Sequence, residues 1–130
     1  MSNNDPFKVL SGENVPEKKG MPVYEEDQSG DLKTRIERLI NSSDVFLFMK
    51  GTPDFPQCGF SANVVGLLNS LDITYKTFDI LSDMDIRQGV KEYANWPTYP
   101  QLWVKGEMVG GNDIVTEMFH SGDLQKLLKS

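Results

Sequence analysis

The stretch Phe48-Met-Lys-Gly-Thr-Pro-Asp-Phe-Pro-Gln-Cys58-Gly-Phe-Ser61 contains the only cysteine of the 130-residue chain. The short apolar run Val45–Met49 leads into it, and its β-prone residues are typical of a strand buried on both faces of a sheet. Two prolines break up the loop that follows. Helical spacing then predicts a helix from Cys58 to about Leu71, with an inward face of Val64, Leu67, Leu68 and Leu71. Any thiol chemistry of this chain must therefore pass through Cys58, at the start of a helix.

The patterns on either side of this unit complete a single α/β domain. A helix is expected from Asp31, with one apolar face made of Leu32, Ile36, Leu39 and Ile40. Further along we expect a strand at 74–80, a helix at 84–93, a hairpin at 101–109, and a last helix from Asp113 that is interrupted at Gly122. Since a helix links the first two strands, they should be parallel, with a right-handed crossover. The predicted fold class is α/β in the order α-βαβ-α-ββ-α, with a mixed four-stranded sheet flanked by helices.

The charge and composition narrow the range of partners. A net charge of −6 disfavours nucleic acid and anionic membrane surfaces, which need a basic face. No apolar run approaches the roughly 18–20 residues that a membrane span requires. A single cysteine excludes a scaffold held by internal disulfides and fits a reducing compartment. We therefore expect a globular protein that binds neither nucleic acid nor membrane.

Residues 1–30 differ in composition from the rest of the chain. They hold three prolines, three glycines and few large aliphatic residues, so we expect a disordered N-terminal extension followed by a domain at 31–130. A partner-binding role for the extension stays open. The extension is acidic and lacks arginine, unlike a mitochondrial presequence. We expect a cytoplasmic location, with the mitochondrial matrix as the alternative if a presequence has been removed.

The sequence allows two interpretations of Cys58, as a structural residue or as a reactive thiol. A lone cysteine is often just a small buried hydrophobic residue. However, the start of a helix favours a thiolate by roughly 0.3–1 kcal/mol, and Lys50 at the end of the preceding strand should lower the thiol pKa further. The residue three positions on is Ser61, so Cys58 has no neighbouring thiol with which to form a disulfide. Cys58 must therefore borrow a second thiol, for which glutathione is the obvious soluble source.

Four blocks of sequence now carry a family resemblance. They are Lys50-Gly-Thr-Pro, Cys58-Gly-Phe-Ser61, Trp96-Pro-Thr-Tyr-Pro-Gln101 and Gly110-Gly-Asn-Asp113. In this order and spacing, over about residues 31–130, they resemble the monothiol glutaredoxins of the Cys-Gly-Phe-Ser class. The resemblance implies a thioredoxin fold, glutathione binding, and a [2Fe–2S] cluster shared between two subunits, with Cys58 as the metal ligand and redox residue.

The resemblance also implies a glutathione site. Lys50 matches the family lysine that meets the glycine carboxylate of glutathione, and Arg87 matches its partner on the third helix, where Lys91 is a further candidate. The alternative for each is an ordinary solvated charge. Thr98, Tyr99 and Pro100 match the family loop with a cis proline, where the cysteinyl unit of glutathione pairs with the backbone of Tyr99. Pro97 is the other candidate for the cis bond.

The opposite end of glutathione is implied to bind at the start of the last helix. Gly111, Asn112 and Asp113 match the family turn that holds the γ-glutamyl group. The amides there suit its carboxylate, and Asp113 suits its ammonium group, or serves only as a helix cap. Many relatives have a second cysteine where Asn112 stands, so Cys58 lacks an internal disulfide partner here. Phe60 is expected beside the cluster, Trp96 at the edge of the site and Trp103 in the core.

The cluster requirement predicts an assembly. A [2Fe–2S] cluster commonly needs four thiolates, so Cys58 of two chains plus two glutathiones would complete the set. We therefore expect a homodimer with cluster, a monomer without it, and iron–sulfur acceptor proteins as partners. The main alternative function is a monothiol oxidoreductase that removes glutathione from protein thiols. A weaker alternative is a regulatory adaptor in iron sensing.

Overall fold

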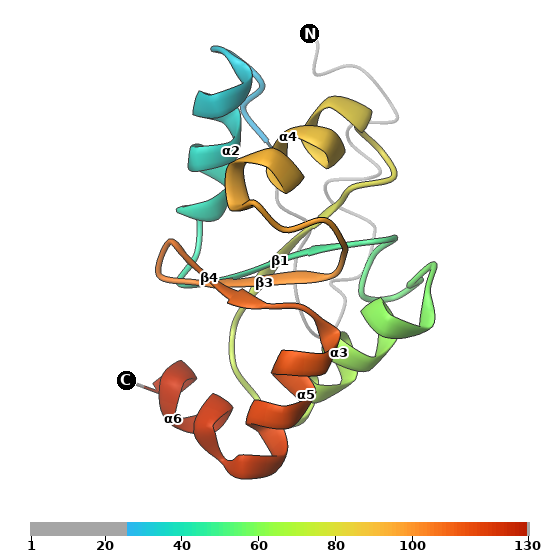
Figure 1. Cartoon of the computed structure of the whole chain (residues 1–130), viewed down its shortest axis with the longest axis vertical. Coiled ribbons are helices and arrows are strands. Elements are labelled where there is room, and N and C mark those ends of the chain that lie inside the picture. The colour runs from blue at the N-terminus through green and yellow to red at the C-terminus, as the bar shows by residue number, and fades with distance from the viewer. Residues whose placement is uncertain (1–25, 130) are drawn as a thin grey trace, which may run out of the picture.

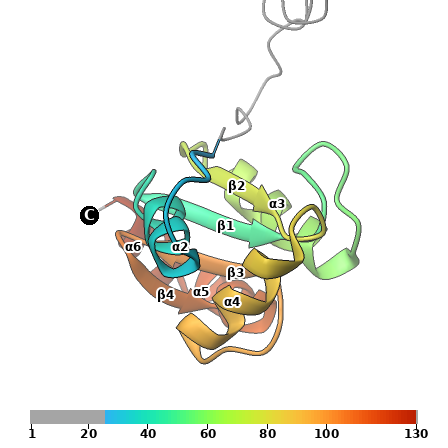
Figure 2. The ribbon, with the colours of Figure 1, turned by 90° about the horizontal axis from the view of Figure 1, so that it is seen from above.

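A computed structural model describes residues 26–129 of the chain, and these form one mixed β-sheet with helices on both faces (Figure 1). The sheet order is β2-β1-β3-β4 (Figure 2). Its strands are β1 (Val45–Met49), β2 (Lys76–Asp79), β3 (Gln101–Val104) and β4 (Glu107–Gly110). β1 runs parallel to β2 and antiparallel to β3, which in turn pairs with β4 in a hairpin. The predicted fold class, element order and parallel pairing are confirmed.

The alternation of side chains along β1 divides the core in two. Val45, Leu47 and Met49 pack with α3 (Gly59–Ser70), α5 (Asn112–Ser121) and α6 (Asp123–Lys129). Phe46 and Phe48 point to the opposite face, where α2 (Leu32–Ile40) and α4 (Met84–Ala94) cover the sheet. All five side chains are buried, and each contributes about 1.5–3 kcal/mol relative to an exposed position. β1 is therefore the centre of the domain, and the residue that follows it is held firmly.

Aspartate side chains cap the N-termini of α2 and α4. The carboxylate of Asp31 accepts a hydrogen bond from the Thr34 amide at 2.9 Å, and Asp83 caps α4 in the same way. Arg35 joins the two helices, because its guanidinium binds Asp83 at 2.7 Å and Glu26 at 2.7 Å. These ion pairs fix α4, which contributes residues to the site described below.

The predicted N-terminal extension falls mostly outside the described residues, which begin at Glu26. The last five residues of the predicted extension are described. Besides the ion pair of Glu26, the backbone carbonyl of Ser29 accepts a hydrogen bond from Arg38 at 3.0 Å. Within the described part of the chain, contacts with the domain therefore begin at Glu26, five residues before the expected boundary.

Some boundaries and faces differ from the prediction. The side chain of Leu32 is 37% exposed, although the spacing placed it on the inward face of α2. In α3 the buried residues are Ser61, Val64, Val65 and Leu68, while Leu67 and Leu71 are only partly buried. β2 is shorter than the predicted 74–80, but the Ile80 amide still donates to the Met49 carbonyl at 2.9 Å. These differences concern the ends and faces of single elements and leave the element order unchanged.

The end of the chain follows the predicted interruption. α5 ends at Gly122, whose φ of +87° is left-handed and favours glycine, and α6 starts immediately after it.

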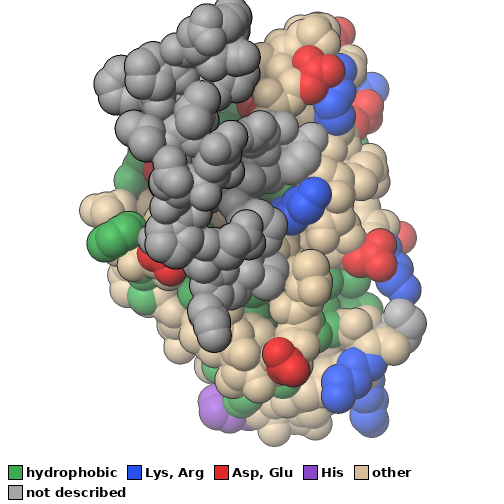
Figure 3. All heavy atoms as spheres, turned by 180° about the vertical axis from the view of Figure 1, so that it is seen from behind, with side chains coloured by type: hydrophobic (Ala, Val, Ile, Leu, Met, Phe, Trp, Pro, Cys, Tyr) green, Lys and Arg blue, Asp and Glu red, His purple; other side chains and the backbone are tan. Residues whose placement is uncertain are grey.

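His120 is exposed near this turn, and Lys/Arg and Asp/Glu side chains are interspersed on the face in Figure 3. None of the helices within residues 26–129 is long and apolar enough to cross a membrane.

Candidate functional site

The loop between β1 and α3 is folded back on itself. The Gln57 amide donates to the Lys50 carbonyl at 2.8 Å, and Gly51 forms an isolated β-bridge with Pro56. Gly51 has a φ of +93°, and a Cβ there would lie 2.7 Å from the Gln57 nitrogen. The carboxylate of Asp79, at the end of β2, accepts from the Gly51 amide at 2.9 Å. These contacts define the path of the chain from Lys50 to Cys58.

Cys58 is the N-cap of α3 and is half-buried. Its sulfur accepts from the Ser61 amide at 3.4 Å and lies 3.5 Å from the Ser61 hydroxyl. Burial raises the thiol pKa, but hydrogen bonds from Ser61 and Phe60 and the charge of Lys50 outweigh it. The net effect is a Cys58 pKa below its ordinary value. The arrangement favours a thiolate that is still accessible to solvent.

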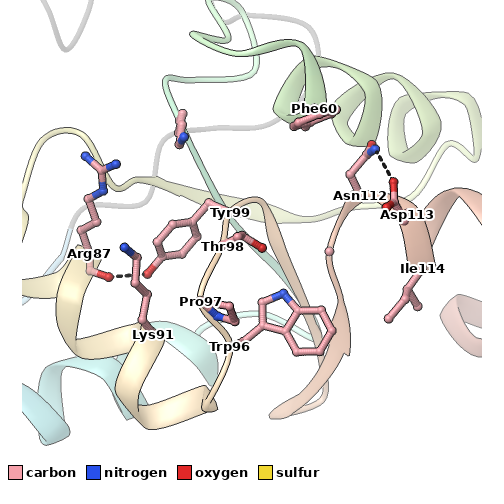
Figure 4. A pocket seen from close by; sticks show the side chains of 12 residues that line it. Phe60, Arg87, Lys91, Trp96, Pro97, Thr98, Tyr99, Asn112, Asp113 and Ile114 are labelled. Carbon is pink, nitrogen blue, oxygen red and sulfur yellow. Dashed lines mark hydrogen bonds between the residues drawn. The ribbon is translucent and has the colours of Figure 1, made fainter.

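Next to the cysteine lies a pocket of about 490 Å³, within the roughly 300–1,000 Å³ typical of small-molecule sites (Figure 4). It is lined by side chains from α3, α4, α5 and the loop before β3. The lining includes seven residues predicted to bind glutathione: Lys50, Arg87, Thr98, Tyr99, Gly111, Asn112 and Asp113. Cys58 and Pro100 are not among the lining residues. Lys50 connects the two places, because it lines the pocket and also lowers the pKa of Cys58.

One end of the pocket is cationic. Arg87 and Lys91 lie one turn apart on α4, on the same side of the pocket in Figure 4, and Lys50 completes the set of basic lining residues. The Tyr99 hydroxyl donates to the Arg87 carbonyl at 2.7 Å, which ties the loop before β3 to α4. Burial raises the pKa of Tyr99, so this hydroxyl remains a donor at physiological pH. This end suits a carboxylate.

The side chain of the buried Gln101 holds the loop before β3 by hydrogen bonds to the loop backbone. The Tyr99–Pro100 peptide bond is cis, as predicted from the motif. The Gln101 amide donates to the carbonyls of Trp96 at 3.2 Å and Thr98 at 3.3 Å, and its oxygen accepts from Trp103 Nε1 at 3.2 Å. We did not predict this role of Gln101. The signal available was a polar residue at the first position of a buried strand.

The other end of the pocket is the start of α5. Gly111 is the N-cap and carries no side-chain capping bond, so the first amides of α5 retain donor capacity. A Cβ at position 111 would lie 3.3 Å from the Pro100 carbonyl, so glycine allows this close approach. Asp113 sits in the first turn, and its carboxylate accepts from Asn112 Nδ2 at 3.2 Å (Figure 4). The alternative that Asp113 is the helix cap is therefore wrong.

Other lining residues were partly anticipated. Phe60 is 62% exposed and lines the pocket, as Trp96 also does. Trp103 is in the core, as expected, with 4% of its surface exposed. Ile114 and Pro97 also line the pocket, and we predicted no binding role for them. Ile114 gave no sequence signal, because an apolar residue in the first turn of a helix is usually read as core.

Known proteins with similar sequences show which family this chain resembles. The sequence profile of the glutaredoxin family matches residues 45–109. "Uncharacterized monothiol glutaredoxin ycf64-like" from Synechocystis is 54% identical over 76% of this chain and 92% of its own length. Monothiol glutaredoxin-S17 of Arabidopsis thaliana is 54% identical over 75% of this chain, but the match covers only 20% of that protein. This chain thus corresponds to nearly all of the first relative and to one part of the second.

Solved structures share the fold. Reduced poplar apo GrxS14 has a TM-score of 0.68 and 50% identity, covering 75% of this chain and 90% of the poplar chain. A buckwheat glutaredoxin–glutathione complex has a TM-score of 0.66 and 26% identity, covering 75% of this chain and 90% of that chain. With one thiol in the Cys-Gly-Phe-Ser stretch and about half of its aligned residues shared with monothiol glutaredoxins, the chain belongs to the glutaredoxin family, on its monothiol branch.

Proposed function

We propose that this protein binds glutathione in the pocket and carries a [2Fe–2S] cluster, held by Cys58 of two chains and two glutathiones, to acceptor proteins. The observation that carries the proposal is one accessible thiol of lowered pKa beside a pocket. One end of this pocket is lined by basic side chains, and the other is formed by the start of α5 with the Asp113 carboxylate. A single protein thiol is too few for such a cluster, and the pocket offers a place for a second, borrowed thiol.

The chemistry of the pocket matches glutathione from end to end. Glutathione carries a glycine carboxylate at one terminus, a carboxylate and an ammonium group at the other, and a thiol between them. Lys50, Arg87 and Lys91 would hold the glycine carboxylate. The amides of α5 would bind the γ-glutamyl carboxylate, and Asp113 its ammonium group. The middle of the molecule would pair with the backbone of Tyr99, as an added strand does.

The cluster is the cargo in this proposal. Cys58 supplies one thiolate, and its lowered pKa keeps that thiolate available for a metal. Half of the ligands would then come from small, exchangeable thiols. A cluster held in this way is released more readily than one held by four residues of a single chain. This favours a carrier over an electron-transfer protein.

Anaerobic reconstitution with iron, sulfide and glutathione tests the proposal. The expected result is a visible absorption band that requires glutathione and disappears in Cys58→Ser. The matched control is Ser70→Ala, a substitution at the far end of α3, which should retain the band. A colourless protein, or a band that persists in Cys58→Ser, would contradict the carrier function.

The thiol also favours a second function, because a lowered pKa activates a nucleophile. In this alternative the Cys58 thiolate attacks the glutathione sulfur of a protein–glutathione mixed disulfide and releases the protein thiol. A second glutathione thiolate then attacks the Cys58–glutathione disulfide, which yields glutathione disulfide and restores Cys58. Steady turnover of a glutathionylated protein, with reduced glutathione consumed, would favour this enzyme over the carrier.

A further inference from the structure

Asn63 links the helix that carries the cysteine to the helix that closes the pocket. It lies on α3, outside the pocket lining, and its side-chain nitrogen makes two bonds to α5. Nδ2 donates to Asn112 Oδ1 at 2.7 Å and to Thr116 Oγ1 at 2.9 Å. Each of the two amide hydrogens therefore has its own acceptor. The partners stand 49 and 53 positions away in the sequence, so only the fold brings them together.

The donors and acceptors in this chain of contacts have a fixed direction. The Asp113 carboxylate only accepts hydrogen bonds, so Asn112 must turn its NH₂ group toward it, at 3.2 Å. This leaves Asn112 Oδ1 on the side of Asn63, which must then present its own NH₂ group. Asn63 meets this need and holds Asn112 in one orientation.

We infer that Asn63 is a positioning residue for the γ-glutamyl end of glutathione, through the chain Asn63 to Asn112 to Asp113. This inference rests on the proposed binding of glutathione in the pocket. Asp113 is exposed, and its side chain is free to rotate unless something holds it. The bond from Asn112 occupies Oδ1 and leaves Oδ2 to meet the ammonium group of the ligand. Asn63 secures this arrangement without touching the ligand.

A purely structural role for Asn63 makes a different prediction. If Asn63 only holds α3 against α5, its bond to Thr116 should matter as much as its bond to Asn112. Thr116→Val removes the bond between Asn63 and Thr116 and leaves the chain of bonds from Asn63 through Asn112 to Asp113 intact. Thr116 does not line the pocket, so it serves as the matched control.

The test is calorimetric titration of the full chain with two probes. One is glutathione, and the other is its analogue without the γ-glutamyl amino group, which cannot use Asp113. For Asn63→Ala we expect glutathione affinity to fall about threefold to tenfold, the effect of one or two lost hydrogen bonds. Thr116→Val should stay within about twofold of the unmodified protein. Affinity for the analogue should change little in either variant.

The outcomes separate the two proposals. If the unmodified protein binds no glutathione, the proposed function fails. If it binds glutathione but Asn63→Ala binds as tightly, or loses equal affinity for both probes, the role of Asn63 is overturned. Asn63→Leu keeps the branched shape of the side chain without its hydrogen-bonding groups and provides the same comparison if the alanine variant does not fold. Equal losses in Thr116→Val and Asn63→Ala would likewise assign Asn63 to helix packing alone.

Discussion

At the residue scale, Ser61 occupies the position where a second thiol could stand, and it also contacts the Cys58 sulfur. Its side chain is fully buried, and its hydroxyl accepts from the Lys50 amide at 3.1 Å while lying 3.5 Å from the Cys58 sulfur. With the Lys50 amide on one side, the hydroxyl hydrogen is free to point at the sulfur when Cys58 is ionised. Ser61 thus stabilises the thiolate as well as excluding an internal disulfide.

Removing the Ser61 hydroxyl should slow the reaction of the Cys58 thiol with an alkylating reagent. In Ser61→Ala the pKa of Cys58 should rise, because a hydrogen bond to the charged form is lost. The reactive thiolate then appears only at higher pH, so the alkylation rate by iodoacetamide at neutral pH should fall about threefold to tenfold. The pH–rate profile should shift to the alkaline side, while Ser70→Ala should leave it unchanged. Superimposable profiles for Ser61→Ala and the unmodified protein would count against this role.

At the element scale, the loop between β1 and α3 depends on one glycine. Gly51 has left-handed φ and no room for a Cβ, whereas Gly66, within α3, has nothing within 4 Å of that position. Gly51→Ala should therefore lower the free energy of unfolding by about 2 kcal/mol or more. Gly66→Ala should raise it by about 0.5–1 kcal/mol, since alanine favours a helix interior. Urea unfolding measures both, and the reverse order would contradict the described loop.

The elements also show how far sequence reasoning reaches. The β1 strand, the start of α2 at Asp31 and the break at Gly122 were predictable, because hydrophobic period, capping and glycine act over a few residues. Exposure of Leu32 was not, since it depends on how α2 lies against α4.

The site divides in the same way. The residues predicted to bind glutathione carried a motif signal, and the structure brings seven of them to one cavity. Gln101 stands at the end of one motif block, but the motif did not reveal its supporting hydrogen bonds, and Asn63 carried no motif signal. Asn63 meets its partners only after α3 and α5 pack together, and Gln101 acts through loop carbonyls whose positions the sequence does not reveal.

At the scale of the whole molecule, the count of thiols governs the proposed assembly. The chain has one cysteine, and a [2Fe–2S] cluster takes four thiolates, so three must come from outside the chain. A second chain supplies one of these, and two glutathiones supply the rest. Cluster binding should therefore depend jointly on protein concentration and on glutathione.

Native mass spectrometry of the reconstituted protein measures this composition directly. The account predicts one species with two chains, one [2Fe–2S] cluster and two glutathiones, and a cluster-free monomer when glutathione is removed. A cluster on a single chain, or a two-chain cluster complex without glutathione, would contradict it.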